Sequence, residues 1–517
     1  MAATVWSAVG CLPTGTSPTG QHLLAERLDS FVTYQPLVTG APPRLLVLRW
    51  DEVTPTNAVQ TASVFDVPAP TASGTVVQPN LLASHALYNG DSCIGCGFPE
   101  DARGRLFFSQ VFGISSTGFE GSVIRVDPAT NASTDLGSFD AFLFSPDRTR
   151  LLTRRGQTWT IRDLDDDETP LPPALDAQFV GGDIYFVSPD DALFQTSALG
   201  TTPRMVSTSV ASFSIVDTSR GPLLVLTKTS TSMDGSARHA LFDPATMTEL
   251  PMPGESAPTY QPFVIPSPSG RYLLLEAYAS TGQPLTMFDR DTGVAQTQTV
   301  DAPSLFQAWR PGHDQLWIDL GPEMFSWTPG GALTPVADQR SPYTAIAPEY
   351  QTIFTPDGAS WISFELDGTA TLRSADDPSA TPLLLTPPGT HLSDCWPLVD
   401  GRGIVEVYPT SQLRNDIYLV DPVKRTSSIL ATGGHVVAVG ANRILTLLNW
   451  IQSDLSGDLT MIDLANGAKT VLAENVHDVA ISPAPAGLDR LPSGVTISYL
   501  VRNRIASPFD GLWSTTP

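Results

Sequence analysis

The chain has 517 residues, of which 53 are acidic and 29 are basic, so its formal net charge at pH 7 is −24. This charge repels phosphate backbones and anionic membrane surfaces, and it argues against nucleic-acid partners. Hydrophobic residues make up 41% and charged residues 16%, which excludes a coiled coil and a disordered chain. The length fits one large ring-like domain or two domains.

Residues 1–30 are predicted to be a truncated lipoprotein-type signal followed by a flexible tether, and residues 31–517 to be the folded region. The start MAATVWSAVGC ends in small residues before Cys11 and resembles the tail of a bacterial lipoprotein signal. The next residues, LPTGTSPTGQ, suit a tether. We therefore expect export to the periplasm or outer membrane, with a lipid on Cys11 as the only contact with a membrane. The alternative is a frayed N-terminus with an incidental cysteine.

A lone C-x-x-C is formed by Cys93 and Cys96 in DSCIGCGFP. No His follows Cys96 and no second C-x-x-C is present, which excludes covalent haem and a zinc knuckle. A redox motif needs a βαβ setting that this region lacks. The plainer interpretation is a disulfide that staples a loop in an exported protein.

A turn signal between short apolar strands recurs about every 42 residues from Pro146 to Pro483. Pro presets φ at the first central position, Asp or Ser bonds to the local backbone, and Gly relieves the exit. Clear copies carry Pro146, Pro268, Pro311, Pro356 and Pro483, and degenerate copies lie at residues 181–183, 217–221, 400–403 and 440–443. The similar SPDD at residues 188–191 is expected to join the next two strands of its own unit.

A second signal, an apolar strand that ends in Asp before a turn, follows about 20 residues after the first. These aspartates are Asp127, Asp243, Asp289, Asp421 and Asp463. Their carboxylates are expected to cap the turns. Four short strands per unit and almost no helical periodicity predict β-propeller blades.

The copies of S-P-D-G-x-x-L-L-L and of apolar-Asp-x-x-T-G resemble TolB-type and WD-repeat propellers over roughly residues 85–517, with a weaker blade at 36–78. The resemblance implies an all-β propeller with about ten four-stranded blades. Single rings usually have about four to eight blades, so this number favours two rings with a boundary near residues 251–262. The alternative is one large ring, in which Phe31–Gln35 would supply the fourth strand that the last unit lacks.

The acidic run at residues 163–168, DLDDDE, has the oxygen density of a calcium loop. It lacks the Gly and the distal Glu that such loops use. A solvated hairpin turn is therefore the prediction here.

Three inner strands place Cys395, His435 and His477 at one register, where Asp140 and Asp176 lie in earlier units. Inner strands begin near the central channel, so one interpretation is a Cys/His/His metal set in the channel. Another is a structural hydrogen bond, because WD repeats place a Gly-His here whose imidazole bonds within its own blade. A third is no role.

No G-x-S-x-G, H-E-x-x-H, Walker or dinucleotide glycine pattern occurs. The sequence therefore favours a non-catalytic binding or scaffold module in the bacterial envelope, with a protein, peptide or glycan ligand and no cofactor. The alternative is a propeller hydrolase or lyase with a metal or polar site at the channel mouth.

Overall fold

The structure is a computed structural model of the chain. It describes residues 22–25, 30–34, 36, 38, 41–42, 44–54, 57–66, 80–88, 100–115, 118–130, 132–197, 202–229, 238–252, 263–276, 283–300, 306–319, 324–337, 355, 357–364, 370–377, 379–386, 390–409, 415–421, 423–451, 455–482, 489, 491–492, 495–501 and 511–515.

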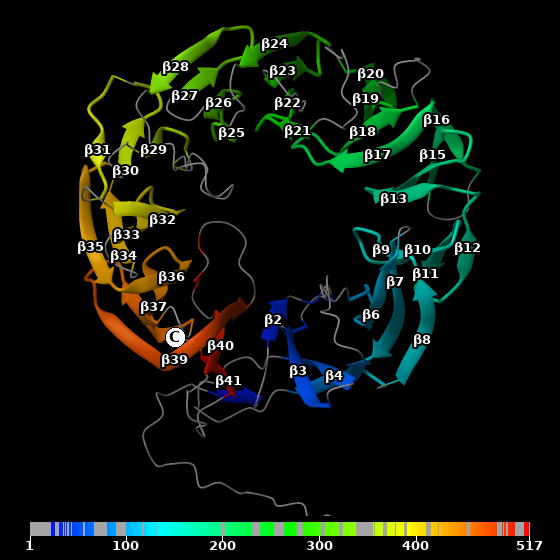
Figure 1. Ribbon diagram of the computed structural model, residues 1–517, viewed down its shortest axis with the longest axis horizontal. Coiled ribbons are helices and arrows are strands. Elements are labelled where there is room, and N and C mark those ends of the chain that lie inside the picture. Colours follow the sequence, from blue (N-terminus) through cyan, green and yellow to red (C-terminus); the bar gives the residue numbers. More distant parts are fainter. Residues whose placement is uncertain are drawn as a thin grey trace, which may run out of the picture.

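The described residues form 41 strands in ten antiparallel sheets, without an α-helix, and the sheets stand side by side around one ring (Figure 1). The prediction of an all-β propeller with about ten blades is confirmed. Sheets are numbered here in chain order. None of the described segments is a helix with the length and apolar character needed to cross a membrane.

Sheets 1 to 3 contain β2 (Ser30–Tyr34), β3 (Arg44–Thr54), β4 (Asn57–Asp66) and β5 (Asn80–Tyr88); β6 (Leu106–Ser115), β7 (Gly118–Asp127) and β8 (Ala132–Phe139); and β9 (Ala141–Phe144), β10 (Arg150–Arg155), β11 (Thr158–Asp163) and β12 (Glu168–Pro170). Sheets 4 to 6 contain β13 (Asp176–Val180), β14 (Asp183–Val187), β15 (Ala192–Ser197) and β16 (Arg204–Thr208); β17 (Val210–Val216), β18 (Leu223–Lys228), β19 (Arg238–Asp243) and β20 (Thr248–Pro251); and β21 (Phe263–Pro266), β22 (Tyr272–Glu276), β23 (Gln283–Asp289) and β24 (Ala295–Val300).

Sheets 7 to 9 contain β25 (Phe306–Trp309), β26 (Leu316–Asp319), β27 (Met324–Trp327) and β28 (Leu333–Ala337); β29 (Ser360–Phe364), β30 (Ala370–Ser374) and β31 (Leu383–Leu384); and β32 (Thr390–Pro397), β33 (Gly403–Pro409), β34 (Asp416–Asp421) and β35 (Thr426–Thr432). Sheet 10 contains β36 (Gly434–Val439), β37 (Arg443–Ile451), β38 (Ser456–Asp463), β39 (Lys469–Ser482), β40 (Thr496–Val501), β41 (Gly511–Thr515) and β1 (His22–Ala25).

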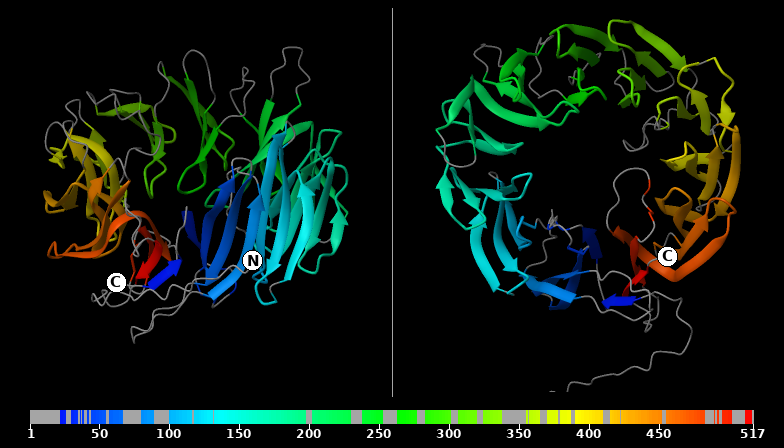
Figure 2. Two further views of the ribbon diagram at one scale, coloured as in Figure 1. Left: turned by 60° about the horizontal axis from the view of Figure 1, so that its bottom comes forward. Right: turned by 180° about the vertical axis from the view of Figure 1, so that it is seen from behind.

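Sheet 10 is a double blade that closes the ring. The first half of β39, up to Val476, pairs with β38, and the second half pairs with β40. The same strand is therefore the outer strand of one four-stranded meander and the inner strand of the next. That second meander is completed by β40, β41 and the N-terminal strand β1, whose Leu23 pairs with Trp513. Figure 2 shows β1 beside β41 where the ring closes.

The chain forms one ring, which is the predicted alternative to two rings (Figure 2). The predicted closing strand is wrong. A strand from the N-terminus does complete the last unit, but it is His22–Ala25, whereas Phe31–Tyr34 of the predicted strand lie in β2, the first strand of sheet 1. The ring therefore includes residues 22–25, which precede residue 31 in the sequence.

Seven of the predicted repeat turns join the first and second strands of their sheets, and the other two, at Pro356 and Pro483, include residues outside the described part. In the turn after β9, the Ser145 hydroxyl donates to Asp147 at 2.6 Å and accepts from the backbone N–H of Arg150 at 3.0 Å. Gly270 and Gly358 occupy the fourth turn position with φ of 66° and 68°. In the first clear copy Arg148 holds this left-handed conformation instead, at φ 52°. The SPDD turn joins β14 to β15, as predicted.

The predicted aspartates cap the turns that follow their strands; four of them end the third strand of a sheet, and Asp127 ends β7 of sheet 2. Each accepts a bond from a backbone N–H two or three residues ahead, in the pairs Asp127–Ala129, Asp243–Ala245, Asp289–Asp291, Asp421–Lys424 and Asp463–Ala465. Both kinds of turn lie on the same face of the ring, because the first strand ends and the third strand ends at the same edge of a meander. We call this the turn face.

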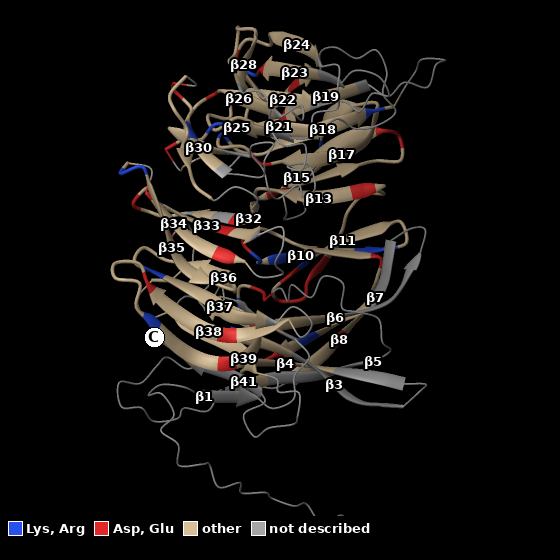
Figure 3. Cartoon of the chain, turned by 60° about the vertical axis from the view of Figure 1, so that its left-hand side comes forward, with Lys and Arg blue, Asp and Glu red and all other residues tan. Residues whose placement is uncertain are grey.

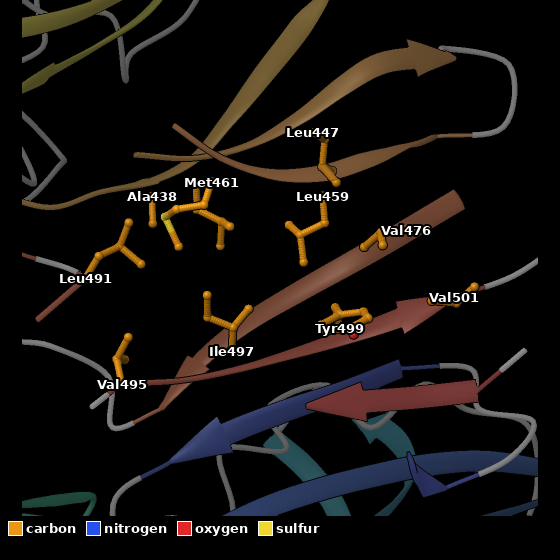
Figure 4. Packing of buried hydrophobic residues seen from close by; sticks show 11 residues of the cluster. Ala438, Leu447, Leu459, Met461, Val476, Leu491, Val495, Ile497, Tyr499 and Val501 are labelled. Atoms are coloured by element: carbon orange, nitrogen blue, oxygen red, sulfur yellow. The ribbon is translucent and has the colours of Figure 1, made fainter. Parts of the chain in front are cut away.

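Hydrophobic clusters fill the space between neighbouring sheets all around the ring. Phe31 and Val47 of sheet 1 pack against Leu500 of β40, which buries the closure itself. Inside sheet 10, Leu459 and Met461 face Ile497 across the two meanders (Figure 4). Because each meander buries one face on each neighbour, no sheet has a core of its own, and ring closure protects the first and last sheets.

On the turn face, arginines from the turns bridge to a neighbouring unit of the ring. Each donates to a backbone carbonyl 48 or 49 residues away, which is about one blade, in the pairs Arg148–Glu100, Arg220–Ser269, Arg310–Gly358 and Arg443–Leu491. Guanidinium groups suit this role because their donors have a fixed fork geometry. Charged residues lie mostly in the turns, and the strands are mainly uncharged (Figure 3).

Candidate functional site

The candidate site lies at the junction of sheets 9 and 10, on the face opposite the turn face. His435 is the second residue of β36, the innermost strand of its sheet. It follows Gly434, where a Cβ would lie 2.6 Å from Cδ2 of Leu448 and 3.2 Å from Cδ1 of Ile417. Glycine therefore allows sheet 9 to approach β36 closely enough for contact with the His435 imidazole.

Glu406 of β33 holds the imidazole from the neighbouring sheet. The Glu406 side chain is fully buried, and its Oε1 lies 2.9 Å from Nδ1 of His435. Its Oε2 accepts the backbone N–H of Val436 at 2.8 Å, and Asn415 Nδ2 also donates to Oε1. A buried carboxylate needs such donors to offset its lost hydration. The imidazole thus bonds to the preceding blade, rather than within its own blade as WD repeats would have it.

The Glu406 carboxylate also sets the charge of the imidazole. Its hydrogen bond raises the pKa of His435 above the ordinary value of 6.5, partial burial opposes this shift, and the negative charge of Asp394 adds to it. With Nδ1 directed at Glu406, Nε2 is left on the opposite edge of the ring, and 45% of the side chain is exposed. The arrangement presents an oriented imidazole to solvent.

One aromatic side chain lies near the imidazole, and a second lies near the end of β33 on the same face of the ring. Trp450, near the end of β37, lies with its ring centroid 6.1 Å from that of His435. Tyr408 stands two residues beyond Glu406, on the same side of β33, and is 41% exposed. Tyrosine and tryptophan combine a large apolar surface with a polar tip, and both are frequent at binding surfaces. We call His435, Trp450 and Tyr408 the aromatic site.

The predicted metal set is not assembled in the described part of the chain. No group of three His, Cys, Asp or Glu side chains there is close enough to hold a metal ion. The backbone of Cys395 lies in β32, but its side chain lies outside the described part. His477 lies in β39 at a register shift between Val476 and Asp478. The set therefore stays a prediction, while His435 has a carboxylate partner.

The other residues at this register have local roles. The Asp140 carboxylate accepts the backbone N–H of Gly156, and the Asp176 carboxylate accepts that of Ala177. Cys11, Cys93 and Cys96 lie outside the described residues, so the lipid site and the disulfide stay predictions.

The acidic run is a hairpin turn between β11 and β12, as predicted. Asp163 Oδ1 accepts the backbone N–H groups of Asp165 and Asp167. Two further carboxylates of this turn reach sheet 2 and the segment before it, in the pairs Asp166–Arg125 and Asp165–Arg103. The turn is therefore a bridge between sheets rather than a merely solvated loop.

Sequence reasoning identified His435 but not its neighbours. Glu406 and Asn415 belong to sheet 9, and no local spacing relates them to β36. One signal was available: Glu406 interrupts the apolar run GIVEVY in a strand that should be buried on both faces. A charged residue in such a strand indicates a buried polar partner.

No family model and no curated protein matches the chain. Among solved structures, it is similar to a dipeptidyl peptidase 4 from Porphyromonas gingivalis, with 12% identity and a TM-score of 0.35, over 93% of this chain and 66% of that one. A eukaryotic initiation factor matches with 10% identity and a TM-score of 0.37, over 65% and 88% of the two chains. TolB from Acinetobacter baumannii matches with 13% identity and a TM-score of 0.21, over 56% and 84%.

The fold is a β-propeller. This rests on the strand pairing described above. None of these matches carries an argument about activity.

Proposed function

We propose that this protein is a binding or scaffold module whose protein or peptide partner docks on the aromatic site. The observation that carries the proposal is the His435–Trp450–Tyr408 group, with its imidazole held by the buried Glu406. Tryptophan and tyrosine are among the residue types that contribute most to binding energy at protein interfaces. Here both sheets are packed into the ring, so little conformational entropy is lost when a partner binds.

The test uses a photo-crosslinking amino acid at Tyr408, in the organism's own extract. The control places the same group at Val423, which is 89% exposed in the turn after β34, on the turn face of the same sheet. We expect a discrete crosslinked protein or peptide from position 408 that is absent from position 423 and disappears in a His435→Ala variant. The proposal is contradicted if the same product crosslinks equally from both positions, or if crosslinking from position 408 is unchanged in the His435→Ala variant.

A second candidate function is supported by the His435–Glu406 pair itself. A carboxylate on Nδ1 fixes the tautomer and leaves Nε2 free to accept a proton, the arrangement that general-base histidines use in hydrolases. A propeller hydrolase or lyase with this polar site would turn over lactones, glycans or peptides. The hydrolase or lyase function is supported if the purified chain turns over such a panel and the activity is lost in His435→Ala but unchanged in His477→Ala. Absence of turnover by the purified chain excludes this function.

For location, we propose a bacterial envelope protein anchored by lipid on Cys11. Support comes from the lipobox-like residues Ala8-Val9-Gly10-Cys11 and the Pro/Thr-rich stretch behind them. Processing that globomycin blocks, and that a Cys11→Ser change abolishes, is the expected result. An unprocessed protein that fractionates without detergent contradicts it.

A further inference from the structure

A small cavity between sheets 2 and 3 is surrounded by arginines. Its wall contains Arg105, Arg125, Arg148, Arg150 and Arg162, but only two acidic residues, Asp101 and Asp163. The cavity volume is about 10 Å³, which is room for one water-sized group. This is an unusual concentration of positive charge in a chain of net charge −24. In Figure 3 basic and acidic segments lie next to each other at β10.

The two carboxylates in the wall direct their hydrogen-bonded oxygens into their own loops. Asp101 Oδ1 accepts the backbone N–H groups of Arg103 and Arg105, and Oδ2 accepts Nε of Arg105 at 2.6 Å. Asp163 Oδ1 accepts two backbone N–H groups of the acidic turn. Acceptors that already bind several donors attract a further donor weakly.

The arginines, by contrast, keep donor capacity. Arg148 and Arg150 donate to the backbone carbonyls of Glu100 and Gly182 at 3.2 and 3.1 Å, and neither forms an ion pair with a carboxylate among the described residues. Both terminal nitrogens of Arg162 face carboxylates, those of Asp166 and Glu168, while its Nε is buried without a hydrogen-bond partner in the described part. A buried N–H without an acceptor costs free energy, so an acceptor in the cavity stabilises it.

We propose that this cavity binds one monatomic anion, chloride in solution, between sheets 2 and 3. The donors favour an anion over a cation, and the volume admits a halide but not a tetrahedral oxyanion. A water molecule is the competing occupant, but it has to donate two protons of its own and faces mainly donors here. The bound anion offsets the guanidinium charges of Arg148 and Arg150, which have no carboxylate partner among the described residues, and so stabilises this junction of the ring.

The test measures thermal unfolding of the full chain as chloride replaces gluconate at constant ionic strength. Because an anion that binds only the folded state stabilises it by mass action, the Tm should rise with chloride and saturate. We expect Arg150→Gln and Arg162→Lys each to weaken the apparent chloride affinity by about tenfold or more. Arg443→Gln is the matched control, because Arg443 also donates to turn carbonyls but lies far from the cavity in sheet 10. It should keep the wild-type chloride response.

Diffraction from crystals grown in bromide provides an independent readout. The proposal expects an anomalous peak in the cavity of the wild type and none in Arg162→Lys. Three results would overturn the proposal. The Tm could respond equally to gluconate, or the chloride response could be unchanged in both cavity variants. The third is a cavity that holds only water in bromide-grown crystals. The measured quantity is the change of Tm with chloride concentration, so it remains measurable in a variant whose Tm is low.

Discussion

Replacing Glu406 with Gln tests the candidate site most sharply, because it removes one charge and keeps the shape of the side chain. The Glu406 carboxylate accepts the Val436 N–H at 2.8 Å and contacts His435 Nδ1 at 2.9 Å. A glutamine has one acceptor oxygen, so if it keeps the Val436 bond, its NH₂ group faces His435. That NH₂ donates to a neutral imidazole and repels an imidazolium. Glu406→Gln should therefore lower the pKa of His435.

The stability loss follows from the same contacts. Hydrogen bonds to a charged group contribute about 1.5–3 kcal/mol each when buried, but the imidazole is 45% exposed and solvent screens its share to below about 1 kcal/mol. We expect Glu406→Gln to lower the free energy of unfolding by about 1–3 kcal/mol. Because the folded-state pKa of His435 is raised, its contribution is full below about pH 6.5 and is lost as pH rises through the folded-state value.

The assay is an NMR titration of the histidine Cε1–H groups. Denaturant unfolding midpoints are measured at pH values below and above the folded-state pKa of His435. His435→Asn assigns the resonance. Glu249→Gln is the matched control, because Glu249 pairs with Lys228 in sheet 5 and no histidine is involved. An unchanged His435 titration in Glu406→Gln, or a stability gap between wild type and variant that does not narrow as pH rises, refutes the reasoning.

Three further predictions concern the ring. Gly358→Ala should destabilise the fold more than Gly312→Ala. Both positions have positive φ, but a Cβ at Gly358 would lie 2.5 Å from a backbone carbonyl oxygen, and a Cβ at Gly312 would have no atom within 4 Å. Equal losses of Tm in the two variants contradict this prediction. Trp317 and Trp361 lie edge to face at 4.9 Å across sheets 7 and 8, so a double-mutant cycle with Leu should show coupling of about 0.5–1.5 kcal/mol, and additivity refutes it. Asp463→Ala should cost about 1 kcal/mol and speed hydrogen exchange of residues 464–468; an unchanged exchange rate counts against the cap.

The repeat chemistry made most of the fold predictable. Proline, serine or aspartate, and glycine at fixed offsets determine where the first and second strands meet, and these requirements are local. The number of rings depends on contacts between distant parts of the chain, so local turn chemistry does not determine it. Blade count favoured two rings, because nothing in the repeat reports that β39 serves two meanders and that β1 completes the second.

The site was only partly predictable for the same reason. Alignment of the first strands of the units on their repeat turns identified His435, because these strands recur with the same spacing. Its partner is a buried Glu406 on another sheet, and that contact depends on how closely two sheets pack at Gly434. The arginine cavity was missed because its members come from segments up to 57 residues apart, from Arg105 to Arg162. Their approach follows from the packing of two neighbouring sheets, not from any motif.

A designed disulfide between the terminal strands tests the single closed ring most directly. His22 of β1 pairs with Ser514 of β41, and Ser514 pairs in turn with Ser498 of β40. Directly paired positions lie within disulfide reach, whereas positions two strands apart are about 9–10 Å from each other and do not. A His22→Cys, Ser514→Cys chain should form this crosslink on oxidation, as identified by peptide mass spectrometry, and a His22→Cys, Ser498→Cys chain should not. Failure of the first pair to crosslink, or equal crosslinking of both pairs, contradicts a ring closed by its N-terminal strand.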